Sequence, residues 1–332
     1  MSKRIIKIHG ATISGWTSVV GRHEGEGPLG NCFDFCDSTD LFGTDTWEKA
    51  ENEMQKKAME LLLRKKNLQV SDFGAMFAGD LQNQCVGSSY GLLNFDIPYF
   101  GLYGACSTAA ESLMMAAMGV SAGYFRRAAA VTSSHYLAAE RQYRSPTEYG
   151  AQRTPTAQWT VTGAAAFCVD TDGRAEITEA VPGIVIEKGI NDANNMGAAM
   201  APAAADTILS YFRESGRTPE EFDTIVTGDL GYEGGSVLCE LLEAEGLDIR
   251  SKYCDCGVLI YDRERQDKHA GGSGCGCSAV VMAAHFLGRV CCGSIKRMLF
   301  IGTGAMMSPS SIQQGLAIPA VAHLICIEHK EG

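Results

Sequence analysis

The fold of this chain is decided by a stretch that occurs twice, as ACSTAAESLMMAAMGVSAGYFRRAAAVTSS at residues 105–134 and as GCSAVVMAAHFLGRVCCGSIKRMLFIGTG at residues 276–304. Both copies begin with a small residue and Cys-Ser, and both continue as an apolar stretch of helical length. A glycine, a basic pair and a short apolar run follow in each copy. The repeat predicts two similar halves, each with a buried helix that leads into a buried strand.

A second repeat lies upstream of each copy, where DFGAMFAGDL at residues 72–81 matches EFDTIVTGDL at residues 221–230. Apolar runs predict buried strands at 73–78, 127–132, 163–170, 222–227, 297–302 and 320–327. Apolar periodicity predicts helices at 47–66, 106–122 and 278–290, of which the last two are apolar nearly all round and therefore expected to be buried. Thr218-Pro219-Glu220-Glu221 is typical of a helix start. Strands that alternate with helices predict an α/β protein.

The domain organisation follows from the repeat. The chain has 332 residues, which suits two domains of roughly 150 residues each or one large α/β domain. We expect an N-terminal half over 1–170 and a C-terminal half over 171–332. Segments near 140–160 and 182–197 have no repeat partner, and we expect them to be insertions that cover a cleft between the halves.

Composition and charge exclude several classes of protein. The chain is 45% hydrophobic and 20% charged, as globular proteins are, and its formal net charge is −11. That charge argues against nucleic acid as a partner and disfavours direct contact with anionic lipid. The N-terminus MSKRIIKIHG lacks the apolar region of a secretion signal, and no apolar run reaches the roughly 20 residues of a membrane span. A cytoplasmic protein is expected.

The thirteen cysteines are crowded into C-x-C and adjacent pairs. Zinc sites usually use C-x₂₋₄-C spacing, so reduced thiols packed in the core are expected, with no metal. GGSGCG lacks the spacing of a dinucleotide loop, and P-loop, HExxH and GxSxG motifs are absent from the sequence. No cofactor is expected.

The duplicated α/β half with Ala-Cys-Ser at the start of a buried helix resembles the thiolase and ketoacyl-synthase superfamily. This resemblance implies a five-layered αβαβα fold built from two duplicated halves. It also implies that Cys106 occupies the position of the superfamily's nucleophilic cysteine.

A closer resemblance, to the stage V sporulation protein AD family of endospore formers, covers nearly the whole chain. It rests on GPLG (27–30), AGDL (78–81), GACST (104–108), TSSH (132–135), AERQ (139–142), PTEYG (146–150), MAPAAADTI (200–208), RTP (217–219), TGDL (227–230), AGGSGC (270–275) and SAVV (278–281). It implies binding of dipicolinic acid (pyridine-2,6-dicarboxylic acid) and a role in its uptake into the developing spore and in germination. Membrane proteins of the same operon are the implied partners, through which the chain would associate peripherally with the spore inner membrane.

The superfamily's other catalytic positions have changed here. The Gly-His-Pro-x-Gly run of thiolases is replaced by Gly272-Ser273-Gly274, so a serine stands in place of the histidine. A second catalytic loop carries an asparagine in thiolases and a histidine in ketoacyl synthases, but here it reads Thr227-Gly228-Asp229-Leu230 and has neither. A third loop carries a second cysteine in thiolases, and here it reads Gly302-Thr303-Gly304. Cys106 therefore lacks a base, and a non-catalytic protein is expected. The alternatives are an acyl-transferring or condensing enzyme that uses Cys106, and a scaffold that binds only sibling proteins.

The predicted ligand site combines amides at a helix N-terminus with hydroxyls and a cation. Its candidate residues are Cys106, Ser133, Ser134, His135, Ser273, Gly274 and Arg144. Arg141 and Arg153 lie in the same insertion and are further candidates for pairing with a carboxylate, although each is more often solvated. His269 is a second candidate base. Asp80 and Asp229 are related by the repeat and are expected to cap backbone N–H groups rather than to act in catalysis.

The run IPYFGL at 97–102 is apolar and would form an exposed sheet edge in a monomer, which is an aggregation hazard. The superfamily resemblance implies that this strand pairs across a two-fold axis. A homodimer is therefore expected.

Overall fold

The computed structural model describes residues 3–143 and 153–331. Its strands are β1 (Ile6–Lys7), β2 (Thr12–Val20), β3 (Phe35–Cys36), β4 (Ala75–Gly79), β5 (Tyr99–Gly101), β6 (Ala128–Ser134), β7 (Trp159–Thr160), β8 (Gly163–Asp170), β9 (Ala175–Val181), β10 (Thr224–Thr227), β11 (Tyr253–Asp255), β12 (Gly272–Ser273), β13 (Arg297–Ala305) and β14 (Ala320–His329). Its α-helices are α1 (Arg22–Gly25), α2 (Trp47–Lys66), α3 (Val86–Gly91), α4 (Thr108–Ser121), α5 (Tyr136–Tyr143), α6 (Met196–Ser215), α7 (Gly231–Ala244), α8 (Cys256–Ile260), α9 (Cys275–Val281), α10 (Leu287–Cys291) and α11 (Pro309–Gln313).

The internal repeat is visible in the strand order. The main sheet runs β11-β10-β13-β14-β9-β2-β8-β6-β4-β5. The N-terminal half contributes the order β5-β4-β6-β8-β2, and the C-terminal half contributes β11-β10-β13-β14-β9. When the two-residue strands β1, β3, β7 and β12 are left out, each order is the third, second, fourth, fifth and first strand of its half. A short antiparallel pairing, Thr12 with Glu176 and Ile13 with Ala175, joins the two sets. Strands such as β4 and β6 are parallel, so their C-terminal ends lie together at one end of the sheet.

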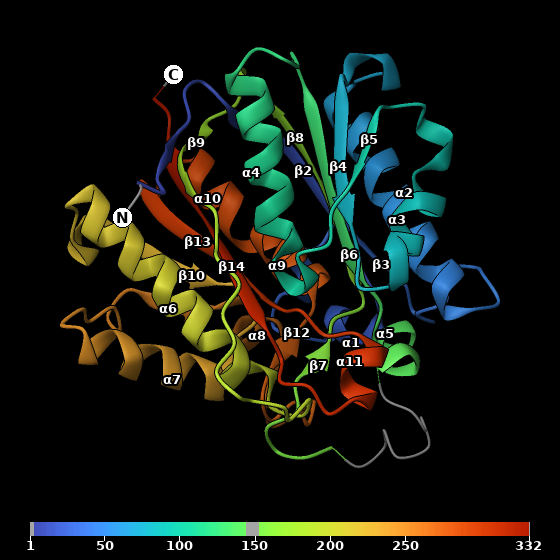
Figure 1. The fold of residues 1–332 in the computed structure, drawn as a ribbon. Coiled ribbons are helices and arrows are strands. Elements are labelled where there is room, and N and C mark those ends of the chain that lie inside the picture. The colour runs from blue at the N-terminus through green and yellow to red at the C-terminus, as the bar shows by residue number, and fades with distance from the viewer. Residues whose placement is uncertain (1–2, 144–152, 332) are drawn as a thin grey trace.

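The elements form five layers of helix, sheet, helix, sheet and helix, as Figure 1 shows. The helix α4 and the segment α9–α10 pack between the two halves of the sheet, while α2 with α3 and α6 with α7 cover the outer faces. The central helices are apolar nearly all round because both faces meet a sheet. Leu113 of α4 and Val280 of α9 are fully buried there. The predicted αβαβα architecture is confirmed.

Local signals explain where several elements begin and end. The Thr46 side chain accepts the Lys49 N–H and caps α2, which ends at Asn67 in a left-handed conformation. A capped helical turn begins at Thr218 as predicted, but the helix is short. It forms only a single 3₁₀ turn, Pro219–Glu221, because the chain becomes extended at Phe222 and leads into β10. The predicted helix over 278–290 is interrupted by a π-helical turn at Met282–Phe286.

A small two-stranded sheet ties the first insertion to the loop before α9. Its strands β7 and β12 are parallel, with Trp159 opposite Gly272 and Thr160 opposite Ser273. The backbones are so close here that a Cβ on Gly276 would lie 2.4 Å from the carbonyl oxygen of Gly163. The glycine-rich loop is therefore a tight contact between the halves, and it fixes the position of Ser273.

Candidate functional site

Cys106 lies where the chain turns from β5 into α4. A 3₁₀ turn, Ala105–Ser107, precedes the helix, and Ala105 has a φ of 50°. The turn packs against the backbone of β13, where a Cβ on Gly304 would lie 2.2 Å from the carbonyl oxygen of Gly104. The strained backbone and the glycine of the opposing strand therefore hold Cys106 in one place. The side chain is buried, and its residue is only 4% exposed.

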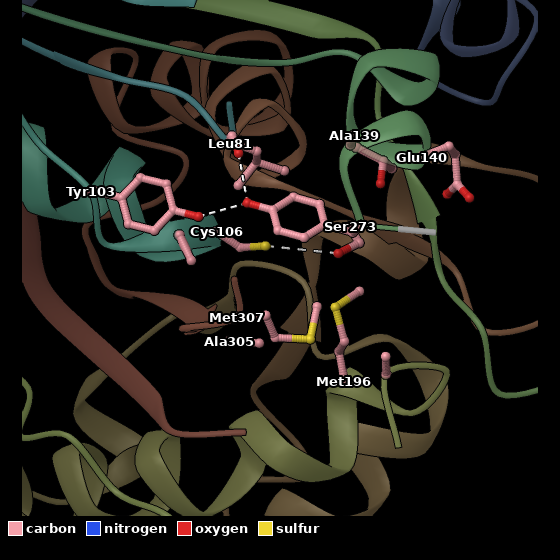
Figure 2. Close-up of a pocket in the computed structure, with 13 residues that line it drawn as sticks. Leu81, Tyr103, Cys106, Ala139, Glu140, Met196, Ser273, Ala305 and Met307 are labelled. Atoms are coloured by element: carbon pink, nitrogen blue, oxygen red, sulfur yellow. Dashed lines mark hydrogen bonds between the residues drawn. The ribbon is translucent and has the colours of Figure 1, made fainter. Parts of the chain in front are cut away.

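A cavity opens beside Cys106 at the C-terminal ends of the parallel strands, with about 560 Å³ of empty space up to its mouth. Its walls are mostly apolar, with a ring of polar groups near Cys106, as in many small-molecule sites (Figure 2). The residues that line it are Leu81, Tyr103, Ala105, Cys106, Ala139, Glu140, Tyr143, Thr160, Ala193, Met196, Ser273, Ala305 and Met307. Ala193 and Met196 belong to the end of the second predicted insertion, and Ala139 to Tyr143 belong to the start of the first.

Cys106, Ser273 and Asp229 form a row at the base of the cavity. The Cys106 sulfur lies 3.9 Å from the Ser273 hydroxyl, which donates to Asp229 Oδ2 at 3.0 Å. The backbone N–H of Gly274 donates to the same oxygen at 2.8 Å, and the Thr303 hydroxyl donates to Asp229 Oδ1 at 2.7 Å. The three second-half loops singled out in the sequence, 227–230, 272–274 and 302–304, therefore meet at Asp229.

The electrostatics of this row keep the thiol protonated. Burial raises the pKa of Cys106 well above its usual range, and the neighbouring Asp229 carboxylate raises that pKa further. Burial also raises the pKa of Asp229, to about 6. A reactive cysteine needs the opposite environment, with a cation or an acceptor base beside the sulfur.

The helix α5 closes one side of the cavity. The Tyr143 hydroxyl donates to the Leu81 carbonyl at 2.7 Å and lies 2.7 Å from the Tyr103 hydroxyl. Figure 2 shows these contacts beside Cys106. Arg153 pairs with Glu140 at 2.7 Å and compensates the only carboxylate among the described residues that line the cavity.

The structure brings some of the predicted ligand-binding residues together and separates others. Cys106 and Ser273 both line the cavity. The amide of Gly274 is directed at Asp229 rather than at the empty space. Arg144 lies outside the described residues.

The strand-end hydroxyls have other partners and do not line the cavity. Ser133 donates to Glu51 at 2.8 Å, on the α2 side of the sheet. Ser134 donates to the Val161 carbonyl at 2.7 Å, on the other side. His135 is 1% exposed and contacts the Asp40 carbonyl at 2.8 Å through Nε2, while the Ala138 N–H donates to its Nδ1. These contacts make the three side chains structural.

The remaining candidates have surface or capping roles. Arg141 pairs with Glu48, and His269 pairs with Asp267 at 2.8 Å on the surface. Asp80 accepts the backbone N–H groups of Gln82 and Ser88, as predicted for a capping aspartate.

Sequence reasoning missed Tyr103, Tyr143 and the two methionines, Met196 and Met307, as walls of the cavity. Tyr103 could have been found, because it lies three residues before Cys106. The other three come from segments without a motif, so only the fold reveals them. Asp229 was assigned to capping, and the structure adds its contact with Ser273.

The described residues contain no cluster of side chains that could bind a metal ion. All thirteen cysteines are free. Within residues 3–143 and 153–331, no group of three or more His, Cys, Asp or Glu side chains is arranged to hold a metal ion. A helix both long and apolar enough to cross a membrane does not occur in the same residues.

Comparison with known proteins finds similarity along nearly the whole chain. The family model described as stage V sporulation protein AD matches residues 2–328. Stage V sporulation protein AD of Bacillus subtilis (strain 168) is 42% identical over 316 residues, which are 95% of this chain and 93% of that protein.

Solved structures share the fold at low identity. A variant of OleA from Xanthomonas campestris superposes with a TM-score of 0.61 at 14% identity, over 98% of this chain and 100% of that one. The 3-oxoacyl-[acyl-carrier-protein] synthase III of Aquifex aeolicus VF5 superposes with a TM-score of 0.58 at 11% identity, over 96% of this chain and 100% of that one. At these identities the likeness shows a thiolase-like fold.

Proposed function

Because this chain belongs to the stage V sporulation protein AD family, we propose that it binds dipicolinic acid without catalysing a reaction. Through this binding it supports uptake of dipicolinic acid into the developing spore, and later germination. In this proposal its partners are membrane channel proteins of the same operon, and the chain associates peripherally with the spore inner membrane.

The observation that carries the proposal is a mostly apolar cavity beside a cysteine that is kept protonated. Cys106 faces Ser273 and Asp229, and burial together with the Asp229 carboxylate raises its pKa well above the usual range. A thiol in this state is a poor nucleophile. The cavity itself remains beside Cys106, and its walls are mostly apolar with a few polar groups, as in many small-molecule sites.

The walls of the cavity suit a flat aromatic acid. Tyr103 and Tyr143 on one side, and Met196 and Met307 on the other, offer apolar and polarisable surfaces for a ring. The hydroxyl group of Thr160 and the N-terminus of α4 offer donors for carboxylate oxygens, and the Ser273 hydroxyl could do so if it turned away from Asp229. Arg153 neutralises Glu140, so this carboxylate does not repel the ligand as an unpaired charge would.

Calorimetric titration of dipicolinate into the purified protein tests the proposal. Pyridine-2-carboxylate is the single-carboxylate control, Cys106→Trp fills the cavity, and Cys292→Trp places the same side chain at an exposed cysteine. We expect saturable binding of dipicolinate that weakens with pyridine-2-carboxylate, disappears in Cys106→Trp and persists in Cys292→Trp. Absence of binding to the unmodified protein would contradict the proposal and favour a scaffold that binds only other proteins.

Acyl transfer through Cys106 is the second candidate, favoured by the hydrogen-bonded row of Cys106, Ser273 and Asp229 and by the thiolase-like fold. In this case the thiol proton would pass through Ser273 to Asp229. Incubation with an acyl-coenzyme A followed by intact mass measurement distinguishes the candidates. A gain of one acyl group that is absent in Cys106→Ser would show acyl transfer, whereas an unchanged mass supports a binding protein.

A further inference from the structure

Basic side chains gather at the end of the molecule opposite the Cys106 cavity, where the parallel strands begin. Its members are Lys66, Arg126, Arg174, Arg289, Lys296 and Lys330, and we call this set the basic face. Four of them are exposed, while Lys66 and Lys330 are half-buried. Within the described part of the chain, none of the six has a carboxylate within 4.0 Å. A carboxylate therefore neutralises none of these charges at close range, although the Lys66 ammonium donates to the Ser14 carbonyl at 2.9 Å.

Contacts between the elements show that these residues belong to one surface. The backbone N–H of Lys330 donates to the Arg174 carbonyl at 2.8 Å, and the N–H of His329 donates to the Lys296 carbonyl at 2.8 Å. The Cys291 thiol at the end of α10 lies close enough to Arg174 and Lys66 for both charges to act on it. Arg127, the neighbour of Arg126, pairs with Asp170 just before the turn that carries Arg174.

Three acidic side chains at this end have hydrogen-bond or ion-pair partners, although only Glu328 among them is paired with cations. Asp223 accepts the backbone N–H groups of Lys296 and Arg297, and Glu176 accepts the N–H of Gly10. Glu328 pairs with Arg297 and Arg217. The exposed acids beside the face in the described part of the chain include Asp172, Asp223 and Glu331, which are fewer than its six cations.

The turn between α4 and β6 adds an aromatic side chain to this surface. Tyr124 is 80% exposed at its tip, two residues before Arg126. Figure 1 shows this turn at the upper side of the molecule, while α5, which lines the cavity, lies at the lower side with α8 and α11. An exposed tyrosine beside cations is the combination found where proteins contact the headgroup region of a bilayer.

We propose that the basic face docks directly onto an anionic phospholipid bilayer. Anionic lipid attracts each nearby lysine or arginine, and this attraction decays within a Debye length of about 8–10 Å at ordinary salt. The ten-residue strand β14 spans roughly 33 Å between the two ends, so the acidic groups around the cavity are screened from the membrane. The net charge of −11 therefore does not prevent contact.

A bilayer fits the face better than a nucleic acid does. A plane meets one end of the molecule only, whereas a long polyanion would pass the acidic flanks of a chain with 39 acidic and 28 basic residues. The orientation follows from the geometry, because docking through the basic face directs the mouth of the cavity away from the bilayer. This proposal does not depend on the identity of the ligand in the cavity.

Co-sedimentation of the full protein with vesicles tests the proposal. We expect binding to vesicles of phosphatidylglycerol and phosphatidylcholine, no binding to phosphatidylcholine alone, and loss of binding near 1 M salt, where the Debye length falls to about 3 Å. Arg174→Gln/Lys296→Gln should weaken partitioning by roughly 25-fold, at about fivefold for each cation. Lys188→Gln/Arg265→Gln removes two exposed cations near the cavity end and leaves the same net charge, so partitioning should be unchanged.

A probe on the face shows whether this end meets the lipid. Tyr124→Trp, compared with the unmodified protein, should add a fluorescence signal that brominated phosphatidylglycerol vesicles quench. Equal loss of binding in the two double variants, or a signal from the introduced tryptophan that bound vesicles leave unquenched, would overturn the proposal. So would absence of binding to anionic vesicles, with or without binding to a DNA duplex. Dipicolinate titration of the same variants reports on the cavity separately.

Discussion

Asp229 is the residue that sets the chemistry of the cavity. Its buried carboxyl group is held by Ser273, Gly274 and Thr303, and its pKa is raised to about 6. Near neutral pH it carries a negative charge beside the Cys106 thiol, which opposes both a thiolate and an anionic ligand. Below its pKa the group becomes neutral and this repulsion disappears.

Affinity for dipicolinate should therefore increase as the pH falls through about 6. A bound anion raises the pKa of Asp229 further, and each unit of that shift corresponds to about tenfold in affinity between the two protonation states. In Asp229→Asn this dependence should vanish, so that the variant binds more tightly than the unmodified protein at about pH 8 and equally at about pH 5. The protonation of dipicolinate also changes with pH. Dividing the affinity of Asp229→Asn by that of the unmodified protein at each pH removes this contribution.

Glu140→Gln is the matched control, because it removes a carboxylate of the same cavity that is paired with Arg153. It should change affinity by a similar factor at every pH. A pH dependence that survives in Asp229→Asn would show that another group is responsible.

Residues 133 to 135 show what the sequence alone cannot resolve at this scale. Ser133 and Ser134 are adjacent in β6, so their side chains point to opposite faces of the sheet. The sequence predicts the strand but not which face meets the cavity, and the structure shows that neither serine does. Ser273 was predictable, because a motif of the superfamily marks its position. Tyr143 was not, because its place depends on how α5 folds back over Leu81.

At the scale of elements, α2 carries an acidic group into the core. Glu51 is 1% exposed and accepts hydrogen bonds from Ser133 and from Gln82 Nε2, at 2.8 and 2.7 Å. Burial and the nearby Asp80 carboxylate raise the pKa of Glu51 to about 8. The helix is therefore anchored by a carboxyl group that is protonated in the folded protein at neutral pH.

This group should make the protein less stable as the pH rises. The folded pKa is about 8, above the ordinary value of 4.5 in the unfolded chain, so the folded state binds the proton more tightly between these values. The free energy of unfolding should consequently fall between about pH 5 and 8, by on the order of a few kcal/mol. Glu51→Gln should remove this slope in urea denaturation measured across that range.

Glu53→Gln provides the comparison on the same helix, because Glu53 is on the surface and pairs with Lys56. Its denaturation curve should follow the unmodified protein at each pH. A slope that persists in Glu51→Gln would assign the effect to Asp80 or to another buried acid.

The elements themselves were largely predictable. The helix α2 and the strands β4, β6, β8, β10, β13 and β14 lie where apolar runs and periodicity predict them. Two-residue strands such as β7 and β12 were not predicted, because they form only where distant backbones meet. The capping signals at Pro219–Glu221 are those of a longer helix, but the chain becomes extended at Phe222 and only a single turn forms.

At the scale of the whole molecule, composition conceals how charge is distributed. The net charge of −11 predicted no direct contact with anionic lipid. The fold places the strand starts, and with them Arg174, Lys296 and Lys330, at one end. Only the topology reveals that these basic residues lie together, because they are up to 156 positions apart in the chain (330 − 174 = 156).

The edge strand β5 bears on the proposed homodimer. It pairs with β4 alone among the described strands, and its Tyr99 and Phe100 are 40% and 48% exposed. Leu93, 66% exposed, lines the same shallow groove as Tyr99. An unpaired apolar edge of this kind is usually covered, because it otherwise promotes aggregation. A second copy of the chain would cover it by pairing β5 with β5.

Phe100→Lys should therefore convert a dimer into a monomer, because a charge on the edge opposes strand pairing. Light scattering coupled to size exclusion at micromolar concentration would measure the change as a halving of the molar mass. Leu316→Lys places the same charge at a residue that is 54% exposed near α11, and it should leave the dimer intact. Phe100 also stacks on Phe77 at 5.0 Å, so thermal denaturation must separate loss of pairing from loss of folding. A monomeric mass for the unmodified protein would contradict the dimer, and an unchanged mass in a folded Phe100→Lys would place the interface elsewhere.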